Sequence, residues 1–420
     1  MSDPADLTAV SAARAIRERR LSPAALLEAC LARAAAREPV LQAMAYLDPA
    51  QARAEQPRPG PLHGLPIGVK DVIDTADMPS EYNSAIWRGH RPRADASCVA
   101  WARAAGAIVL GKTVTTEFAT RFPGPTTNPH DPARTPGGSS SGSAAGVAAG
   151  YFPLAYGTQT AGSIIRPAAY CGIVGYKPSF GTINRFGMKL MSESLDTVGV
   201  MARSVGDCAL LTSAVTGLDL GDPEVKPERG PRIGVCRSPV WDRAAPETHA
   251  LFEQVPGALA RAGAEIRDFT LPDGFAELEA AHAVVMNAES ARALGWELNT
   301  ARDKLSPVLR ERMEWGLLQP ATALLEAQAL FRRLQSGFKA AIGELDMLLT
   351  PSAPGVAPVG LEWTGDAAFN FIWTSLHVPC VTVPAGTGPG GMPLGVQVVT
   401  RRGEDRAALT WAAWVAAALA

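Results

Sequence analysis

The chain has 420 residues and a formal net charge of −2 at pH 7, with charged side chains making up 19% of its residues. A chain of this length can bury a large hydrophobic core, and its length is compatible with one large α/β unit or with two or three domains. The charges nearly balance, and no basic or acidic run stands out. This composition argues against a nucleic-acid-binding surface.

The six cysteines and six histidines are dispersed. They form no C-x-x-C pair, no H-E-x-x-H motif and no zinc-finger spacing, so we expect reduced thiols in a cytoplasmic protein, with no metal site and no other cofactor. The N-terminal "MSDPADLTAV" lacks the basic start and apolar stretch of a signal peptide. The C-terminal "AALTWAAWVAAALA" is shorter than the about 20 residues that span a bilayer, so it predicts a helix packed on the core.

The N-terminal half of the chain predicts helices first and then strands. Residues 5–37 predict two helices, with Ser22 as an N-cap between them and Pro23 at the first helical position. From about residue 60 to 210 the sequence changes to Gly, Ser, Thr, Pro and short apolar runs. The elements expected in this part are strands over 66–73 and 107–112 and a small-residue helix over 140–150.

The second half of the chain returns from helices to strands. Residues 210–345 combine one predicted strand, 232–237, with long Ala-, Leu- and Glu-rich helices, for example 247–262 and 277–300. After residue 345 the expected elements are strands within 346–354, 377–386 and 393–400, then the final helix. Interleaved strands and helices predict an α/β fold with a mixed sheet flanked by helices on both faces. We therefore expect residues 1–420 to form a single domain, with a Ser- and Gly-rich core over 60–210 and a mainly helical insertion over 210–345.

Residues 106–113, "GAIVLGKT", match the phosphate-loop pattern G-x-x-x-x-G-K-[ST]. A phosphate loop needs a strand before its first glycine and a pliable loop between its two glycines. Here a predicted helix precedes Gly106, and the apolar residues 107–110 predict a buried strand. The pattern therefore indicates a strand, and nucleotide binding is retained only as a rival function.

A second motif lies in "TPGGSSSGSAAG", residues 135–146, where Gly138, Ser140 and Gly142 match the nucleophile elbow G-x-S-x-G. The elbow requires a preceding strand, whereas a proline-punctuated loop precedes this segment. The elbow serine also needs a histidine partner, and the spacing leaves three downstream histidines open: His249, His282 and His377.

Lys70 lies within the apolar run of residues 66–73. Burial disfavours the charged ammonium, so the pKa of such a lysine falls and the amine becomes a competent base near neutral pH. Taken alone, Lys70 also fits a lysine at a strand end whose stem is buried and whose ammonium reaches water.

Together these segments resemble the amidase signature family of Ser-Ser-Lys hydrolases, most closely its short, malonamidase-type members. The resemblance covers most of the chain and rests on these stretches, in order: "GLPIGVKD", "AGAIVLGKTVTTEFA", "TPGGSSSGSAA", "GTQTAGSIIRPAAYCG", "SLDTVG", "PSAPGVAP", "PCVTVP" and "PLGVQVV". It implies that Ser163 is the nucleophile and that Ser139, often after a cis peptide, connects it to the base Lys70. Such a triad works through an acyl-enzyme.

The resemblance also implies an oxyanion hole made of the backbone N–H groups of Thr160, Ala161, Gly162 and Ser163. Many members of the family have glycine where this chain has Ala161, so a positive φ there would be strained. Gln159 stands where many members carry aspartate; the malonamidase-type members share the glutamine.

Arg166 follows Ser163 by three residues, whereas the common family pattern places an arginine two residues after the nucleophile. If a helix starts near Ser163, position i+3 shares the face of the serine. The resemblance to malonamidase-type members implies that Arg166 holds a substrate carboxylate. The alternative is an arginine that pairs with a structural carboxylate such as Asp196.

The sequence thus predicts an amidase that hydrolyses a small, carboxylate-bearing amide such as malonamate. Two alternatives remain: an amidase, urethanase or aryl-acylamidase acting on neutral substrates, and an amidotransferase subunit that supplies ammonia to misacylated tRNA. The expected partner is a small-molecule amide, without nucleic acid or membrane. The oligomeric state stays open, a homodimer included.

Overall fold

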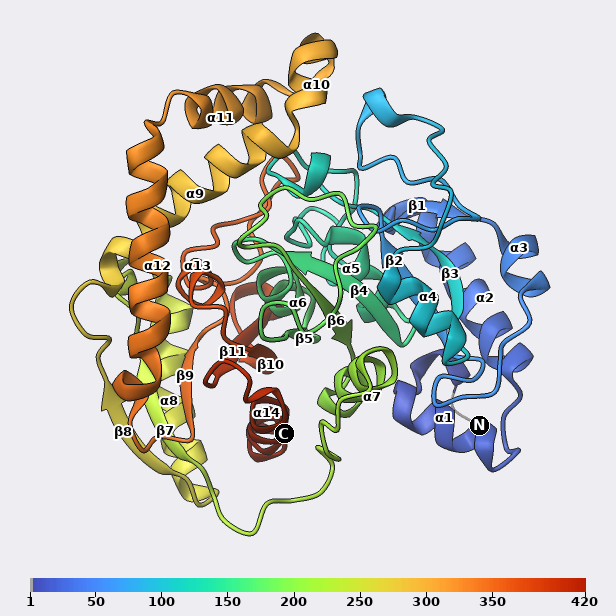
Figure 1. Ribbon diagram of the computed structural model, residues 1–420. Coiled ribbons are helices and arrows are strands. Elements are labelled where there is room, and N and C mark those ends of the chain that lie inside the picture. Colours follow the sequence, from blue (N-terminus) through green and yellow to red (C-terminus); the bar gives the residue numbers. More distant parts are fainter. Residues whose placement is uncertain (1–2) are drawn as a thin grey trace.

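A computed structural model describes residues 3–420. Its centre is one sheet of eleven strands in the order β1-β3-β2-β4-β6-β5-β10-β11-β9-β7-β8 (Figure 1). The strands are β1 Met44–Leu47, β2 Pro66–Lys70, β3 Ile108–Thr113, β4 Leu154–Gln159, β5 Val174–Lys177, β6 Thr197–Ala202, β7 Arg232–Cys236, β8 Glu265–Phe269, β9 Met347–Pro351, β10 Cys380–Thr387 and β11 Pro393–Val399.

The sheet is mixed, as the sequence predicts. Strand β2 pairs in parallel with β3 and with β4, and β7 pairs in parallel with β8 and with β9. The strands between these two parallel groups pair antiparallel, from β4 through β6, β5, β10 and β11 to β9. The last two strands of the chain therefore lie in the middle of the sheet.

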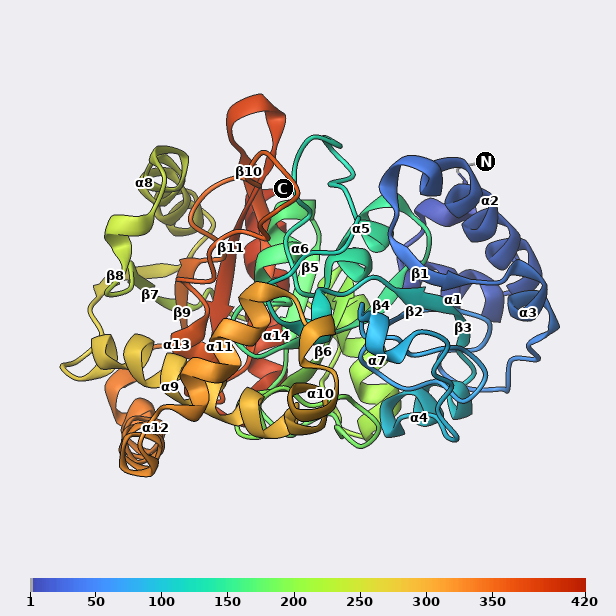
Figure 2. The ribbon, with the colours of Figure 1, turned by 90° about the horizontal axis from the view of Figure 1, so that it is seen from above.

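Helices cover both faces of the sheet. Helices α5 and α6 pack against each other on one face, and α7 and α14 pack against each other on the other (Figures 1 and 2). The helices are α1 Ala9–Arg17, α2 Pro23–Leu41, α3 Pro49–Ala54, α4 Ser97–Ala104, α5 Ser141–Ala149, α6 Ile165–Cys171, α7 Val205–Thr216, α8 Pro246–Arg261, α9 Leu278–Ala293, α10 Gly295–Thr300, α11 Pro307–Leu317, α12 Ala321–Ile342, α13 Phe371–Ser375 and α14 Asp405–Leu419.

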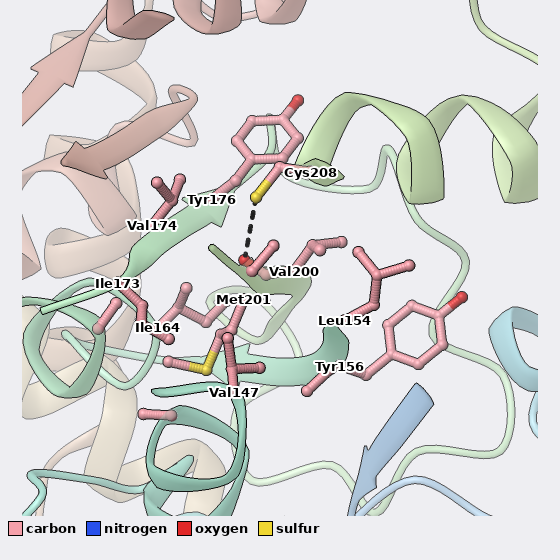
Figure 3. Close-up of a cluster of buried hydrophobic side chains, with 14 of the residues drawn as sticks. Val147, Leu154, Tyr156, Ile164, Ile173, Val174, Tyr176, Val200, Met201 and Cys208 are labelled. Carbon is pink, nitrogen blue, oxygen red and sulfur yellow. Dashed lines mark hydrogen bonds between the residues drawn. The ribbon is translucent and has the colours of Figure 1, made fainter. Parts of the chain in front are cut away.

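The core between the sheet and its helices is made of buried aliphatic, aromatic and thiol side chains (Figure 3). Val147 of α5 lies near Leu154 and Tyr156 of β4, all of them fully buried. On the opposite face, the Cys208 thiol of α7 approaches the Val200 carbonyl of β6 at 4.0 Å. Close packing on both faces fixes β4, whose carboxyl end enters the candidate site.

A separate group of helices stands beside the sheet. Helix α9 contacts α11, α12 and α13, and these four helices lie together in both ribbon views (Figures 1 and 2). The apolar faces of α9, α12 and α13 form a second hydrophobic cluster that includes Leu278, Phe331 and Trp373, whereas Leu309 and Met313 of α11 belong to the main cluster. The amphipathic pattern of α12 explains this placement, because its buried side chains recur at helical spacing while its other face is exposed.

Several predicted elements differ from the observed ones. The helix expected over 277–300 is two helices, α9 and α10, which meet at Leu294. The segment 210–345 carries a second strand, β8, that the sequence analysis did not predict. The break between α1 and α2 is as expected, because the Ser22 hydroxyl accepts a hydrogen bond from the Ala25 N–H at 3.1 Å. Across residues 3–420, we find no helix with both the length and the apolar character needed to cross a membrane.

Candidate active site

Lys70 is the last residue of β2 and belongs to the candidate site. Strands β2 and β4 run in parallel, so their carboxyl ends reach the same edge of the sheet. This geometry brings Lys70 to Thr158 of β4 and to Ser139, which precedes α5. The Lys70 Nζ atom lies 2.7 Å from Ser139 Oγ and 2.7 Å from Thr158 Oγ1. All three side chains are buried.

The protonation state of Lys70 follows from this burial. Desolvation holds the pKa of Lys70 well below its ordinary value of 10.5, and the negative charge of Asp196 opposes this shift only in part. Low polarity disfavours the ammonium more than the neutral amine. A neutral amine has a lone pair, so Lys70 can accept a proton from the hydroxyl of Ser139.

Ser139 and Ser140 have different surroundings. The peptide bond between Gly138 and Ser139 is cis. The Ser140 hydroxyl accepts a hydrogen bond from the Thr158 N–H at 3.2 Å and lies 3.3 Å from the Thr158 carbonyl. Ser140 therefore ties α5 to β4 and is absent from the cavity lining. No strand in the described chain leads directly into Ser140, so the match to the nucleophile-elbow pattern does not make an elbow here.

Ser163 lies just before α6, and its side chain lines a cavity of about 360 Å³. The Ser140 N–H donates to the Ser163 carbonyl at 3.4 Å and so ties the segments of the two candidate serines together. The cavity is lined by residues of four regions: Ala119–Arg121, then Thr160, Ala161, Ser163, Arg166 and Met191, then Glu279, His282, Ala283, Met286, Asn287, Ser290, Leu309, Arg312 and Met313, and finally Trp363–Ala367 with Phe371.

The loop from Thr160 to Ser163 has each of its first three carbonyls held by a donor. His282 Nε2 donates to the Thr160 carbonyl at 2.9 Å, and Thr374 Oγ1 donates to the Ala161 carbonyl at 2.8 Å. The Arg166 N–H donates to the Gly162 carbonyl at 3.0 Å. Helices α9, α13 and α6 supply these three donors.

Because a trans peptide is planar, its N–H points away from its C=O. Anchoring three consecutive carbonyls therefore orients the N–H groups of Ala161, Gly162 and Ser163 in the opposite directions. Throughout residues 3–420 we find no hydrogen-bond acceptor for these three N–H groups. They are available to a developing negative charge at the cavity.

The backbone conformation of this loop suits its sequence. Ala161 has no positive φ, so its methyl group brings none of the strain that the sequence analysis raised. Gly162 is required for a different reason: a Cβ there would lie 2.9 Å from Asn370 Cγ, whose side chain is buried. Glycine thus allows the loop to lie directly against Asn370.

Gln159 connects β4 to the start of α6. Its Oε1 atom accepts hydrogen bonds from the N–H groups of Ile164 and Ile165 at 2.9 and 3.1 Å. Its Nε2 atom donates to Thr374 Oγ1 at 3.0 Å. The amide therefore satisfies orphan donors at the helix start and holds Thr374 toward the loop. An aspartate at this position lacks the second function, because a carboxylate has no N–H to donate.

Arg166 is buried in the cavity wall. Its Nη2 atom donates to the Gly138 carbonyl at 2.7 Å and contacts Thr364 Oγ1 at 3.3 Å. Its Nε–H has no acceptor in the described chain. Asp196 is not its partner, because that carboxylate binds the Thr160 hydroxyl at 2.5 Å and the Met191 N–H at 2.7 Å. The alternative of an Arg166–Asp196 pair is therefore wrong.

The phosphate-loop pattern has a structural explanation. Residues 108–113 are the buried strand β3. Lys112 forms a buried ion pair with Asp71 at 3.2 Å and donates to Ser80 Oγ at 2.5 Å. Its ammonium is therefore already neutralised by protein groups and does not extend toward a phosphate site.

The structure brings all seven site residues predicted from the sequence to one region. They are Lys70, Ser139, Thr160, Ala161, Gly162, Ser163 and Arg166. The structure also adds three polar residues whose roles here the sequence analysis did not predict: Thr158, His282 and Thr374. His282 was left open only as a partner of the elbow serine, whereas it binds the Thr160 carbonyl. Thr158 lies in the quoted signature stretch, one residue before Gln159, so its proximity to Lys70 was open to inference. His282 and Thr374 lie 122 and 213 positions from their loop partners, and no local pattern marks them.

Comparison with known proteins shows the family of the chain. The family model "Amidase" matches residues 25–409. The chain is 34% identical over 455 aligned positions to a subunit of the glutamyl-tRNA(Gln) amidotransferase of Chloroflexus aggregans, covering 94% of this chain and 93% of that protein. The corresponding protein of Thermus thermophilus is 34% identical, with 93% of each chain covered.

Solved structures also match over nearly the whole chain. One amidase crystal structure has a TM-score of 0.90 at 32% identity, covering 99% of this chain and all of that one. A protein from a vestigial complex, described as revealing the origins of an s-triazine catabolic enzyme, has a TM-score of 0.87 at 30% identity, with 97% and 98% covered. The chain therefore belongs to the amidase family and is an enzyme that acts on C–N bonds.

Proposed function

We propose that Ser163 is the nucleophile of an amide hydrolysis in which Ser139 and Lys70 move the proton. The observation that carries this proposal is the 2.7 Å contact between Lys70 Nζ and Ser139 Oγ in a fully buried setting. A serine hydroxyl is a weak nucleophile until a base removes its proton. The neutral Lys70 amine accepts the Ser139 proton, and Ser139 in turn accepts the proton of Ser163.

In the first half-reaction, Ser163 Oγ attacks the amide carbon, and the carbonyl oxygen becomes an oxyanion. The N–H groups of Ala161, Gly162 and Ser163 donate to this oxyanion. The proton then returns from Lys70 through Ser139 to the amide nitrogen, and the C–N bond breaks. Ammonia or an amine leaves, and an ester on Ser163 remains.

In the second half-reaction, water attacks the ester carbon and gives its proton to Lys70 through Ser139. The collapse of this second tetrahedral intermediate breaks the ester bond. The proton returns to Ser163 Oγ, and the acid product leaves. Thr158 assists by accepting a hydrogen bond from Lys70 Nζ at 2.7 Å, which keeps the lone pair of the amine directed to Ser139.

We further propose that two parts of the chain have different roles in the site. Residues 60–210 supply the catalytic groups, and the helical insertion over 210–345 closes the cavity. From this insertion, His282 holds the Thr160 carbonyl and Arg312 contributes to the cavity wall.

For the substrate, we propose a small amide that carries a carboxylate, as in malonamate. The support for this is Arg166, which lies in the cavity wall with Ser163 and has a buried Nε–H without an acceptor in residues 3–420. A guanidinium binds a carboxylate through two parallel N–H donors. A malonamidase-type specificity within the family follows from this assignment.

The second candidate is an amidotransferase subunit that releases ammonia from glutamine for a tRNA-linked reaction. The curated relatives support this candidate more than they support a malonamate specificity, because they are subunits of such an enzyme and match over nearly their full length. The alignment of 455 positions is longer than this chain, so the relatives contain segments that the chain lacks. The partner of this candidate would be another subunit of a complex. An amidase acting on neutral substrates is the third candidate.

The deciding experiment measures ammonia release from malonamate, its uncharged diamide and glutamine, for the wild type and for Arg166→Ala. A preference for malonamate that Arg166→Ala abolishes supports a carboxylate-directed amidase. Glutamine as the best substrate, with a second protein that co-purifies, supports the amidotransferase subunit. If the wild type and Arg166→Ala each release ammonia from malonamate and from the diamide at equal rates, Arg166 does not bind a substrate carboxylate. Ser163→Ala serves as the inactive control.

A further inference from the structure

Three guanidinium groups share the candidate cavity. Arg166 comes from α6, Arg312 from α11, and Arg121 from the loop after residues 117–119. Arg166 is buried, Arg312 is half-buried and Arg121 is exposed, so the three groups extend from the floor of the cavity to its mouth. Within the described residues, none of the three forms an ion pair with a carboxylate.

The two carboxylates of the cavity share one arginine, which offsets one of their two negative charges. Glu279 and Asp366 both line the cavity, and both approach Arg243, at 2.7 and 3.8 Å respectively. Arg243 itself is absent from the cavity lining. Three guanidinium groups and two carboxylates line the cavity, so the balance of charge on its wall is positive, although the chain as a whole has a net charge of −2.

Arg312 has a neutral partner where an anion would be expected. Its Nε and Nη2 atoms both donate to the single Oδ1 atom of Asn287, at 3.0 and 2.9 Å. This contact fixes the guanidinium plane and leaves its charge uncompensated. Burial, together with the positive charge of Arg121, lowers the pKa of Arg312 to about 10. An unpaired cation in a partly buried position is costly, and an anionic ligand would remove that cost.

From this arrangement we propose that Arg121 and Arg312 form a second anion subsite at the cavity mouth. The preferred substrate is then a small amide with two acidic groups, one bound by Arg166 and the other by Arg121 and Arg312. This inference rests on the proposed function, in which the cavity binds the substrate. It narrows the substrate class from amides that carry a carboxylate to amides that carry two acidic groups. A cavity of about 360 Å³ admits such a small molecule.

The inference also bears on the choice between candidate functions. Glutamine carries one carboxylate and one ammonium group, and a wall with three guanidinium groups repels the ammonium. An acylated amino acid whose acyl part ends in a second carboxylate matches the wall better. N-Succinylglycine has this form, and N-acetylglycine is the matched amide with only one carboxylate.

The test measures binding and turnover separately. Equilibrium dissociation constants for N-succinylglycine and N-acetylglycine are determined by calorimetry on Ser163→Ala, which cannot turn them over by the proposed route. We expect tighter binding of the dianion, and about a tenfold loss of that binding when Arg121→Gln or Arg312→Gln is added. Binding of the monoanion should change by less than about twofold. The matched control is Arg310→Gln, on the same helix but outside the cavity lining, which should leave both constants unchanged.

Equal affinity for the two ligands in the parent protein would overturn the inference, as would an unchanged dianion affinity in Arg121→Gln. Arg121 is exposed, so this variant reports on the subsite even where Arg312→Gln disturbs the packing of α11. Glycine release by the protein with Ser163 intact is measured in parallel. Preferential dianion binding without release from any amide would support the subsite and refute the proposed hydrolysis, so the two failures are distinguishable.

Discussion

His282 offers the sharpest test of how the loop from Thr160 to Ser163, the proposed oxyanion loop, is oriented. Its Nε2–H donates to the Thr160 carbonyl at 2.9 Å, and that carbonyl belongs to the same peptide plane as the Ala161 N–H. Burial lowers the pKa of His282 to about 4, so the imidazole is neutral at physiological pH and keeps its proton on Nε2. We predict that His282→Asn, whose amide is too short to reach the carbonyl, weakens catalysis by releasing this plane.

The expected magnitude follows from what the substitution leaves in place. Losing one oxyanion donor outright costs roughly 10²–10³ in kcat. Thr374 still holds the adjacent Ala161 carbonyl at 2.8 Å, so the released plane keeps part of its orientation. We therefore expect a fall in kcat of about 10- to 100-fold, with KM within about twofold, because an oxyanion donor acts in the transition state. The buried Thr160 carbonyl left without its donor lowers the free energy of unfolding by about 1–3 kcal/mol.

Two further variants separate catalysis from stability. His282→Gln places an amide N–H near the position of Nε2 and should restore most of kcat. His377 provides the matched control, because its Nε2 donates to the Ser194 carbonyl at 2.7 Å, its pKa is also lowered by burial to about 4, and it lies outside the cavity lining. His377→Asn should cost stability and leave kcat nearly unchanged. A wild-type kcat in His282→Asn, or an equal loss in His377→Asn, would refute the reasoning.

Three other predictions follow from the site and the fold. Ser163→Ala should abolish amide turnover, and substantial residual ammonia release would contradict the nucleophile assignment. The value of kcat/KM should rise with pH through the depressed pKa of Lys70, because only the neutral amine accepts a proton; the acid limb should lie well below pH 10.5 and should vanish together with activity in Lys70→Met. Lys112→Met should lower the free energy of unfolding by about 3–5 kcal/mol, measured by denaturant titration, because it leaves Asp71 buried without its cation. Tight ATP binding that Lys112→Met abolishes would instead revive a nucleotide site at β3.

The parts of the site that could be predicted from sequence are those encoded in continuous stretches. Lys70 lies in an apolar run, and Ser139 and Ser163 lie in continuous stretches that resemble the amidase signature, so the resemblance identifies all three. His282 and Thr374 could not be found this way, because their role depends on how α9 and α13 pack beside the sheet. A donor to a backbone carbonyl requires only one N–H or O–H in the right place, and many residue types supply one.

The fold shows the same contrast between local and distant information. Strands β2 and β3 are buried throughout and consist mainly of apolar residues, so they were predicted, whereas β8 is an edge strand whose residues are mostly exposed. Charged side chains on an edge strand disfavour pairing with strands of other molecules. The same charges interrupt the apolar run by which a strand is predicted from sequence. The break between α9 and α10 was missed because the residues on both sides of Gly295 continue the helical composition.

The strand order has a consequence for how the chain reaches its native state. Strands β10 and β11, formed by residues 380–387 and 393–399, lie between β5 and β9, so the middle of the sheet is completed by strands that are synthesised after all its other strands. Until β10 and β11 are made, no hydrogen-bonded strand joins β5 to β9. For most of that time Thr374 has not been synthesised either, so the Ala161 carbonyl lacks its donor. Pairing between segments so distant in sequence is slow, because the entropy of closing long loops is lost before the contacts form. Nascent chains that end before residue 380 should therefore carry every member of the Ser-Ser-Lys triad and yet remain unfolded at the sheet centre and inactive.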